Sequence, residues 1–144
     1  MTTEGVIACK EELHLTDENG VLTEIVGLQS TSLPNYTVSD VDITDMKSGC
    51  TTITRAGLID LGTVSFTLKH STGSATDALL EEHFFSKETR PAKIVTEDEA
   101  GAMQEVECNA YVQNYARGSE ATAGTVRTST GTLKLTSRPT TTAQ

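Results

Sequence analysis

The sequence contains no tryptophan, and only three phenylalanines and three tyrosines occur among its 144 residues. The apolar fraction is 36%, which is low for a compact globular domain. Carbohydrate-binding modules usually present aromatic platforms, so the absence of tryptophan counts against that class. Lysine and arginine number 11 against 20 acidic residues, for a formal net charge of −9. Tight wrapping around nucleic acid is disfavoured, because phosphate binding depends on cationic side chains.

Cysteine patterns, targeting signals and long apolar runs are also lacking. Cys9, Cys50 and Cys108 are odd in number and form no CxxC pair, which excludes a zinc pattern and a disulfide framework. This usage favours a reduced, intracellular compartment. The first residues do not read as a signal peptide, and no apolar run approaches the roughly 20 residues that span a bilayer. We therefore expect no membrane partner.

Motifs that carry catalysis or bind cofactors are missing as well. The sequence has no GxxxxGK[ST], GxGxxG or GxSxG pattern. His83 lies on an apolar helical stripe, so we expect its side chain to be packed in the core. His14 and Cys9 are only two possible ligands, which is too few to predict a metal site. The acids Glu97, Asp98 and Glu99 are consecutive, unlike the spaced ligands of a calcium loop, and predict a solvated turn. We expect no enzymatic activity, no cofactor and no metal.

Threonine, in contrast, is abundant, with 25 occurrences. β-branched residues favour strands, so the composition predicts a β-rich chain in which many sheet faces are polar and exposed to solvent. Two long strands alternate apolar and polar residues, which is typical of half-buried antiparallel strands. Their predicted ranges and apolar faces are 58–70 with Val64, Phe66 and Leu68, and 103–115 with Val106, Cys108, Ala110 and Val112. Shorter or weaker strands are predicted within 23–30, 36–45, 92–96 and 125–137.

A single helix is predicted over about residues 75–87. Ser74 is a suitable N-cap, apolar residues recur at helical spacing, and Pro91 limits extension of the helix. The chain is interpreted as one domain, 1–144, with a polar N-terminal arm over about 1–20 and a flexible C-terminal tail over about 138–144. Within the arm, Asn19-Gly20 is a candidate hairpin turn.

Residues 25–66 carry a pattern of short motifs in a defined order. Asp42-Ile43-Thr44 is followed by the loop pair Ser48-Gly49, and then by the segment Gly57-Leu58-Ile59-Asp60-Leu61-Gly62-Thr63-Val64-Ser65-Phe66. This arrangement resembles the tail-tube proteins of lambda-like siphophages and of gene transfer agents, in which similar steps lead into a long strand. With the helix, the resemblance spans roughly residues 23–136. After Gly49, Cys50-Thr51-Thr52 departs from the aromatic and Arg-Glu common in the family.

The resemblance implies an antiparallel β-sandwich or barrel with one flanking helix. It also implies a structural virion protein, the major tail-tube subunit, in which six copies form a ring and rings stack into a hollow conduit. Its partners are then other copies of itself, other tail proteins such as tape-measure and tail-completion proteins, and DNA that passes through the lumen without specific binding. Alternatives are another tail ring component, a soluble β-sandwich binding module and, last, a hydrolase.

Two groups of residues are candidates for function in such an assembly. The segment 46–57 is predicted to be a long loop that reaches a neighbouring ring or subunit. Its candidate contact residues are Asp45, Met46, Lys47, Ser48, Gly49, Cys50, Thr51 and Thr52. An acidic lumen is the second expectation, because a basic wall would retain DNA by counterion release. Its candidates are Glu105 and Glu107 on the strand 103–115, which holds no Lys or Arg, and Asp40 and Asp42.

Overall fold

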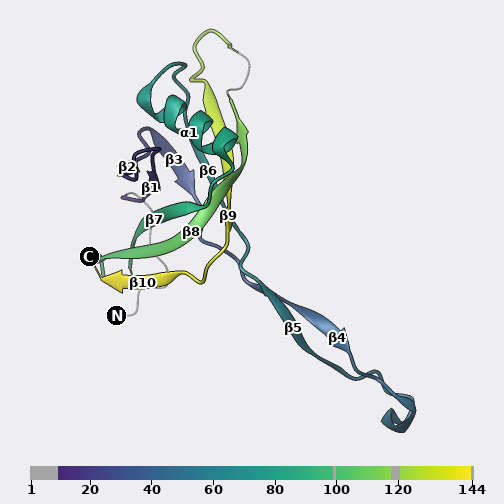
Figure 1. The fold of residues 1–144 in the computed structure, drawn as a ribbon. Helices are drawn as coiled ribbons and strands as arrows, with labels where there is room; N and C mark the ends of the chain where they lie inside the picture. The colour runs from purple at the N-terminus through teal and green to yellow at the C-terminus, as the bar shows by residue number, and fades with distance from the viewer. Residues whose placement is uncertain (1–9, 99, 118–120, 144) are drawn as a thin grey trace.

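The computed structural model describes residues 10–98, 100–117 and 121–143. Within these ranges the chain forms ten strands, one α-helix and one 3-10 turn (Figure 1). The strands, in chain order, are β1 Glu12–Thr16, β2 Leu22–Glu24, β3 Leu28–Thr31, β4 Thr37–Asp42, β5 Thr54–Asp60, β6 Thr63–Lys69, β7 Arg90–Glu97, β8 Met103–Ala116, β9 Thr128–Leu135 and β10 Thr140–Ala143. The turn η1 is Met46–Ser48, and the helix α1 is Ala75–Ser86.

Eight of the strands form one antiparallel sheet with the order β2-β1-β7-β8-β9-β6-β3, and β10 pairs with β8. The long strand β8 organises the sheet. Residues 103–110 of β8 pair with β7, residues 110–116 pair with β9, and residues 104–107 also pair with β10. The remaining strands, β4 and β5, form a separate two-stranded hairpin that projects far from the body (Figure 1). The predicted class, mainly antiparallel β with one helix, is therefore confirmed.

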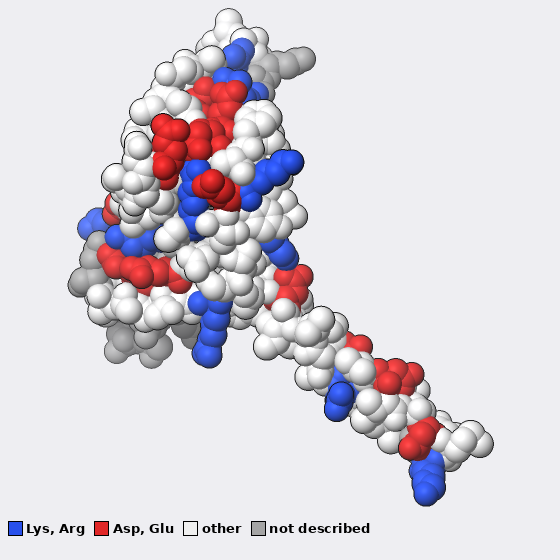
Figure 2. Space-filling view, viewed as in Figure 1, with Lys and Arg blue, Asp and Glu red and all other residues white. Residues whose placement is uncertain are grey.

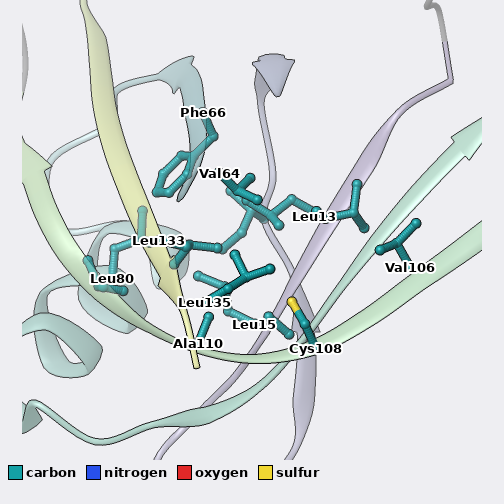
Figure 3. Close-up of a cluster of buried hydrophobic side chains, with 14 of the residues drawn as sticks. Leu13, Leu15, Val64, Phe66, Leu80, Val106, Cys108, Ala110, Leu133 and Leu135 are labelled. Carbon is teal, nitrogen blue, oxygen red and sulfur yellow. The ribbon is translucent and has the colours of Figure 1, made fainter. Parts of the chain in front are cut away.

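The core lies where the sheet bends around its own apolar face (Figure 3). The alternation predicted for the two long strands is confirmed, since their apolar residues are buried and their polar residues lie on the opposite face. Packing is close where β9 crosses the aromatic ring of Phe66, because a Cβ at Gly131 would lie 2.4 Å from Phe66 Cζ. The largest fully buried side chains include Phe66, Leu13, Leu15, Leu80, Ile94 and Leu133.

The helix α1 forms close to its predicted range. Ser74 caps it by accepting a hydrogen bond at Oγ from Asp77 N over 3.2 Å, and Lys87 ends it in a left-handed conformation with φ of 59°. Leu80 and His83 face the sheet and are fully buried. In the part of the chain that the structure describes, no helix has the length and apolarity needed to cross a bilayer.

Both predicted ends of the domain need correction. The expected N-terminal arm contains β1, whose Leu13 and Leu15 are completely buried, and the first nine residues of that arm lie outside the described residues. The candidate turn at Asn19-Gly20 does close a hairpin between β1 and β2. The expected C-terminal tail contains β10, which forms backbone pairs with β8 although its side chains are exposed. Backbone pairing to a sheet edge leaves no apolar signature, so the threonine run gave no sign of a strand.

The strand predicted over 58–70 is two strands. Gly62, with a φ of 80°, lies in the break between β5 of the hairpin and β6 of the main sheet. The predicted loop over 46–57 is accordingly shorter, because residues 54–57 are part of β5. The alternation of apolar residues continues across this break, so the pattern alone predicted one strand.

Candidate assembly surfaces

The β4–β5 hairpin is held to the body at its base. Asp60 Oδ1 accepts hydrogen bonds from Lys134 Nζ on β9 over 2.7 Å and from Gly62 N over 2.9 Å. The hydrogen bond from Lys134 is the main reason that the pKa of Asp60 lies below its usual value. Gly62 lies so close to Asn35 that an added Cβ would be 2.2 Å from the Asn35 carbonyl oxygen. These contacts fix the direction in which the hairpin leaves the sheet.

Beyond its base the hairpin has no protein surface to pack on. All six residues of β4 are exposed, as are six of the seven residues of β5. The cross-strand pair Val41 and Arg55 lies on one face, and Asp40 with Ala56 lies on the other. A two-stranded hairpin alone in water is at best marginally stable. Its exposed large apolar residues are Val38, Val41, Ile43, Met46, Ile53, Leu58 and Ile59.

The predicted contact residues Asp45–Thr52 all lie at the tip of this hairpin. Thr44 closes the tip, because its Oγ1 accepts a hydrogen bond from Ile53 N over 2.7 Å and donates one to Ile53 O over 3.2 Å. Asp45 Oδ1 accepts a hydrogen bond from Lys47 N over 2.9 Å, which shapes the turn η1. Met46 is 98% exposed. The structure thus gathers these residues at one projecting point, and their role in assembly stays a proposal.

The four acidic lumen candidates do not lie together. Glu105 and Glu107 are on the outer face of β8, whereas Asp40 and Asp42 are on the hairpin. Glu105 has a cationic neighbour on the adjacent strand, because Lys93 of β7 donates to Glu105 Oε1 over 3.2 Å. Glu107, the cross-strand partner of Lys93, is exposed. The cation comes from the adjacent strand, so reading β8 alone could not reveal it.

Figure 2 shows acidic and basic side chains interspersed over the body and along the hairpin on this face of the molecule. The net charge of −9 is therefore not concentrated in one patch on this face. Asp42 shares in this pattern at the hairpin, where its Oδ1 accepts a hydrogen bond from Thr44 N over 2.8 Å. Hydrogen bonds from Thr44 lower the pKa of Asp42, so this carboxylate keeps its charge.

Two polar networks that the sequence did not reveal fix the helix against the sheet. The buried Asp77 accepts hydrogen bonds from Tyr115 Oη over 2.7 Å and from Arg117 Nη2 over 2.9 Å. Burial and the hydrogen bond to Asp77 raise the pKa of Tyr115 to about 12. Arg90 Nη1 and Nη2 donate to the Glu82 carboxylate over 2.7 and 2.8 Å. Asp77 is 38 and 40 residues away from its partners Tyr115 and Arg117, whereas Glu82 and Arg90 are only 8 residues apart. Neither network corresponds to a local sequence motif.

His83 and His14 have different surroundings. His83 is 1% exposed, as expected for a packed residue, and burial lowers its pKa. His14 lies on the outer face of β1, where its Nε2 is 3.3 Å from Glu12 Oε1. Possible ligand atoms of Glu12, His14 and Glu24 all lie within 4.8 Å of one another. This cluster is part of the mixed-charge surface of β1 and β2.

No family model and no curated protein matches the sequence. Solved structures do match over nearly the whole chain. A chain of the anti-feeding prophage baseplate, determined by cryo-EM with 6-fold symmetry, has a TM-score of 0.70 and 13% identity, covering 99% of this chain and 97% of that one. The tail of an empty gene transfer agent particle, refined with C6 symmetry, gives a TM-score of 0.63 and 17% identity, covering 92% and 96%. The SPP1 tail tube gives 0.63 and 11%, covering 93% and 77%.

The chain has the fold of tail-tube subunits. The resemblance expected from residues 23–136 is thus confirmed at the level of the fold. The match to the gene transfer agent tail covers 92% of this chain, which is more than the range 23–136. β1 at one end of the chain pairs with β7, and β10 at the other end pairs with β8, so both belong to the main sheet.

Proposed function

We propose that this chain is a structural subunit of a phage-like tail, whose copies form six-membered rings that stack into a tube. The observation that carries the proposal is the β4–β5 hairpin, a long projecting arm with seven exposed large apolar side chains, on a tail-tube fold. A projecting arm that binds elsewhere on an identical copy makes a heterologous contact, and such contacts propagate without closing. The 6-fold symmetry of the similar structures supports six copies per ring.

Within this proposal, the chain is the major tube subunit, found in the virion tail and assembled in the host cytoplasm. Tape-measure and tail-completion proteins are its partners, and its role is structural, with no catalysis. A second candidate is a ring that ends or begins a tube. It is favoured by the TM-scores of 0.70 for chains of the anti-feeding prophage baseplate and of its tube-terminating cap, against 0.63 for the gene transfer agent tail.

Negative-stain microscopy of the purified chain distinguishes these roles. Filaments that elongate with protein concentration are expected for the tube subunit. Discrete rings that do not elongate are the result for a terminating or baseplate ring. A chain that stays monomeric by light scattering with its tail partners, and does not enter virions, would contradict the proposal as a whole.

Deleting Lys47 to Thr52 is expected to leave a folded monomer that does not polymerise. The Ile43 N–Ile53 O bond of 2.9 Å brings the two strands together, so Asp45 and Met46 can connect them after the deletion. Lys47 and the residues 49–52 are exposed, so their loss should cost the core little. Circular dichroism and light scattering measure the two outcomes. A control that replaces the same six residues by glycine and serine separates loop length from side-chain contacts, and normal tubes from the deletion would refute the role of the tip.

Glu105 and Glu107 are proposed to face the lumen, which DNA crosses without binding. Replacing both with lysine should permit assembly but slow DNA ejection by about tenfold or more, since lysines near phosphates release counterions. Higher salt should reduce the slowing. Ejection kinetics of virions carrying the double variant provide the measurement.

The matched control for that experiment is the pair Glu18→Lys and Glu24→Lys, which changes the net charge equally at exposed positions on β2 and its preceding turn. Ejection at the normal rate in the Glu105 and Glu107 variant would place these residues outside the lumen. Equal slowing in both variants would show an effect of total charge instead of position.

A further inference from the structure

A groove between the C-terminal end of α1 and β8 gathers aromatic residues in a chain that has few. Phe84, Phe85, Tyr111 and Val112 line it, with Lys87 and Gln113 at the rim, and its volume is about 640 Å³. Three of the six phenylalanine and tyrosine residues of the chain are therefore in one place. Phe85 is 69% exposed, and its ring meets that of Phe84 edge to face with centroids 5.3 Å apart. Aromatic residues are enriched where proteins bind one another.

The tip of the β4–β5 hairpin has the complementary chemistry. Met46 is the most exposed large apolar residue of the described chain, and Ile43 and Ile53 behind it are each more than 40% exposed. Methionine adapts its shape to aromatic surfaces and gains from contact between its sulfur and the rings. The groove is open to solvent, so its aromatic residues are accessible to such a side chain. Apolar character thus matches between tip and groove.

Charge and position favour the same pairing. Lys87 at the rim of the groove is a cation, and the exposed hairpin end carries the acids Asp42 and Asp45 beside Lys47. Figure 1 shows the hairpin projecting away from α1, so the tip and the groove of one copy do not meet. Only a second copy can bring the two surfaces together. Such a contact is head to tail, and it leaves a free tip and a free groove at the ends of the array.

We propose that the hairpin tip of one copy, with Met46 at its centre, seats in the Phe84–Phe85–Tyr111 groove of another copy. This contact rests on the proposed function, because it supplies the receptor for the arm that joins copies in the tube. It assigns the C-terminal end of α1 to the interface, where the sequence motifs gave no sign of one.

A disulfide trap tests the contact without removing either Met46 or the aromatic residues. Cys50 is a free, exposed cysteine at the tip, and Gln113 is an exposed residue at the rim. The variant Gln113→Cys is prepared in a background of Cys9→Ser, and Cys108 stays because it is buried. Mild oxidation of assembled tubes should link Cys50 to the new cysteine between copies, since disulfides form only when the two Cα atoms lie within about 7 Å. The readout is a ladder on a non-reducing gel.

Two controls define the result. Val26→Cys, at a position that is 70% exposed and lies away from the groove, gives the background yield. Cys50→Ser together with Gln113→Cys should abolish the ladder. Tubes that form without a yield above the Val26→Cys background would overturn this contact and leave the proposed function standing. If the unmodified chain stays monomeric with its tail partners and does not enter virions, the proposed function fails, and the contact fails with it.

A second pair of variants measures the contribution of the aromatic side chain. Phe85→Ser should raise the protein concentration needed for polymerisation by about tenfold, which corresponds to about 1.4 kcal/mol per contact. Phe85→Leu keeps an apolar side chain and should stay close to the unmodified protein. Because Phe85 is mostly exposed in the single copy, neither variant should alter folding measured by circular dichroism. Equal polymerisation of the serine and leucine variants would contradict the seating of the tip on Phe85.

Discussion

Replacing Gly62 with alanine is expected to lower the free energy of unfolding by about 3 kcal/mol or more. Gly62 has a φ of 80°, which is costly for any residue with a Cβ. In addition, the new Cβ would lie 2.2 Å from the Asn35 carbonyl oxygen, so the backbone at the hairpin base has to move. Urea unfolding followed by far-ultraviolet circular dichroism measures the loss, because the chain has no tryptophan to report it.

Gly73→Ala is the matched control for this substitution. Gly73 has a φ of 81°, and a Cβ added there would have nothing within 4 Å, so only the backbone conformation is penalised. Its cost should be about 1 kcal/mol. The difference between the two variants isolates the contact with Asn35. Equal losses would mean that the hairpin base relaxes freely, and that the direction of the hairpin is not fixed there.

Replacing Leu13 with alanine is expected to destabilise the protein by about 2–5 kcal/mol. Leu13 is completely buried on β1, so truncation removes apolar contacts and leaves a cavity in the core. The control is Val21→Ala, between β1 and β2, where the side chain is 58% exposed. There the loss of stability should stay within about 0.5 kcal/mol. Both losses of stability follow from the shift in the denaturant midpoint, provided that the dependence of the unfolding free energy on denaturant concentration stays the same. A loss at Leu13 as small as that at Val21 would restore the interpretation of residues 1–20 as an arm.

Sequence reasoning predicts an element correctly where the spacing of its apolar residues, or a capping side chain, determines that element. The faces of β6 and β8 and the helix with its Ser74 cap follow from local patterns that burial enforces. It fails at Gly62, because alternation continues through a glycine that separates the hairpin strand β5 from β6 of the main sheet. It also fails for β1, where Leu13 and Leu15 are the only strongly apolar residues of a short strand among charged neighbours.

The candidate site shows the same division. Glycine and polar residues mark the turn within the segment 45–52, and the structure places that segment at the tip of the hairpin. The length of the arm behind it does not follow from the sequence, because it depends on two strands that pair only with each other. The groove at Phe84 and Phe85 has no sequence signal either, since phenylalanines on a helix predict burial and only the packed structure shows one of them exposed.

The ion pair between Asp60 and Lys134 has a consequence for the order of events during synthesis. Asp60 is made 74 residues before Lys134, according to their positions in the sequence. At translation rates of about 5–20 residues per second, the interval is roughly 4–15 s. During that time β6 has no β9 beside it, and the hairpin exists without the strand that anchors its base. The arm therefore lacks the part of its anchor that β9 supplies until the chain is nearly complete.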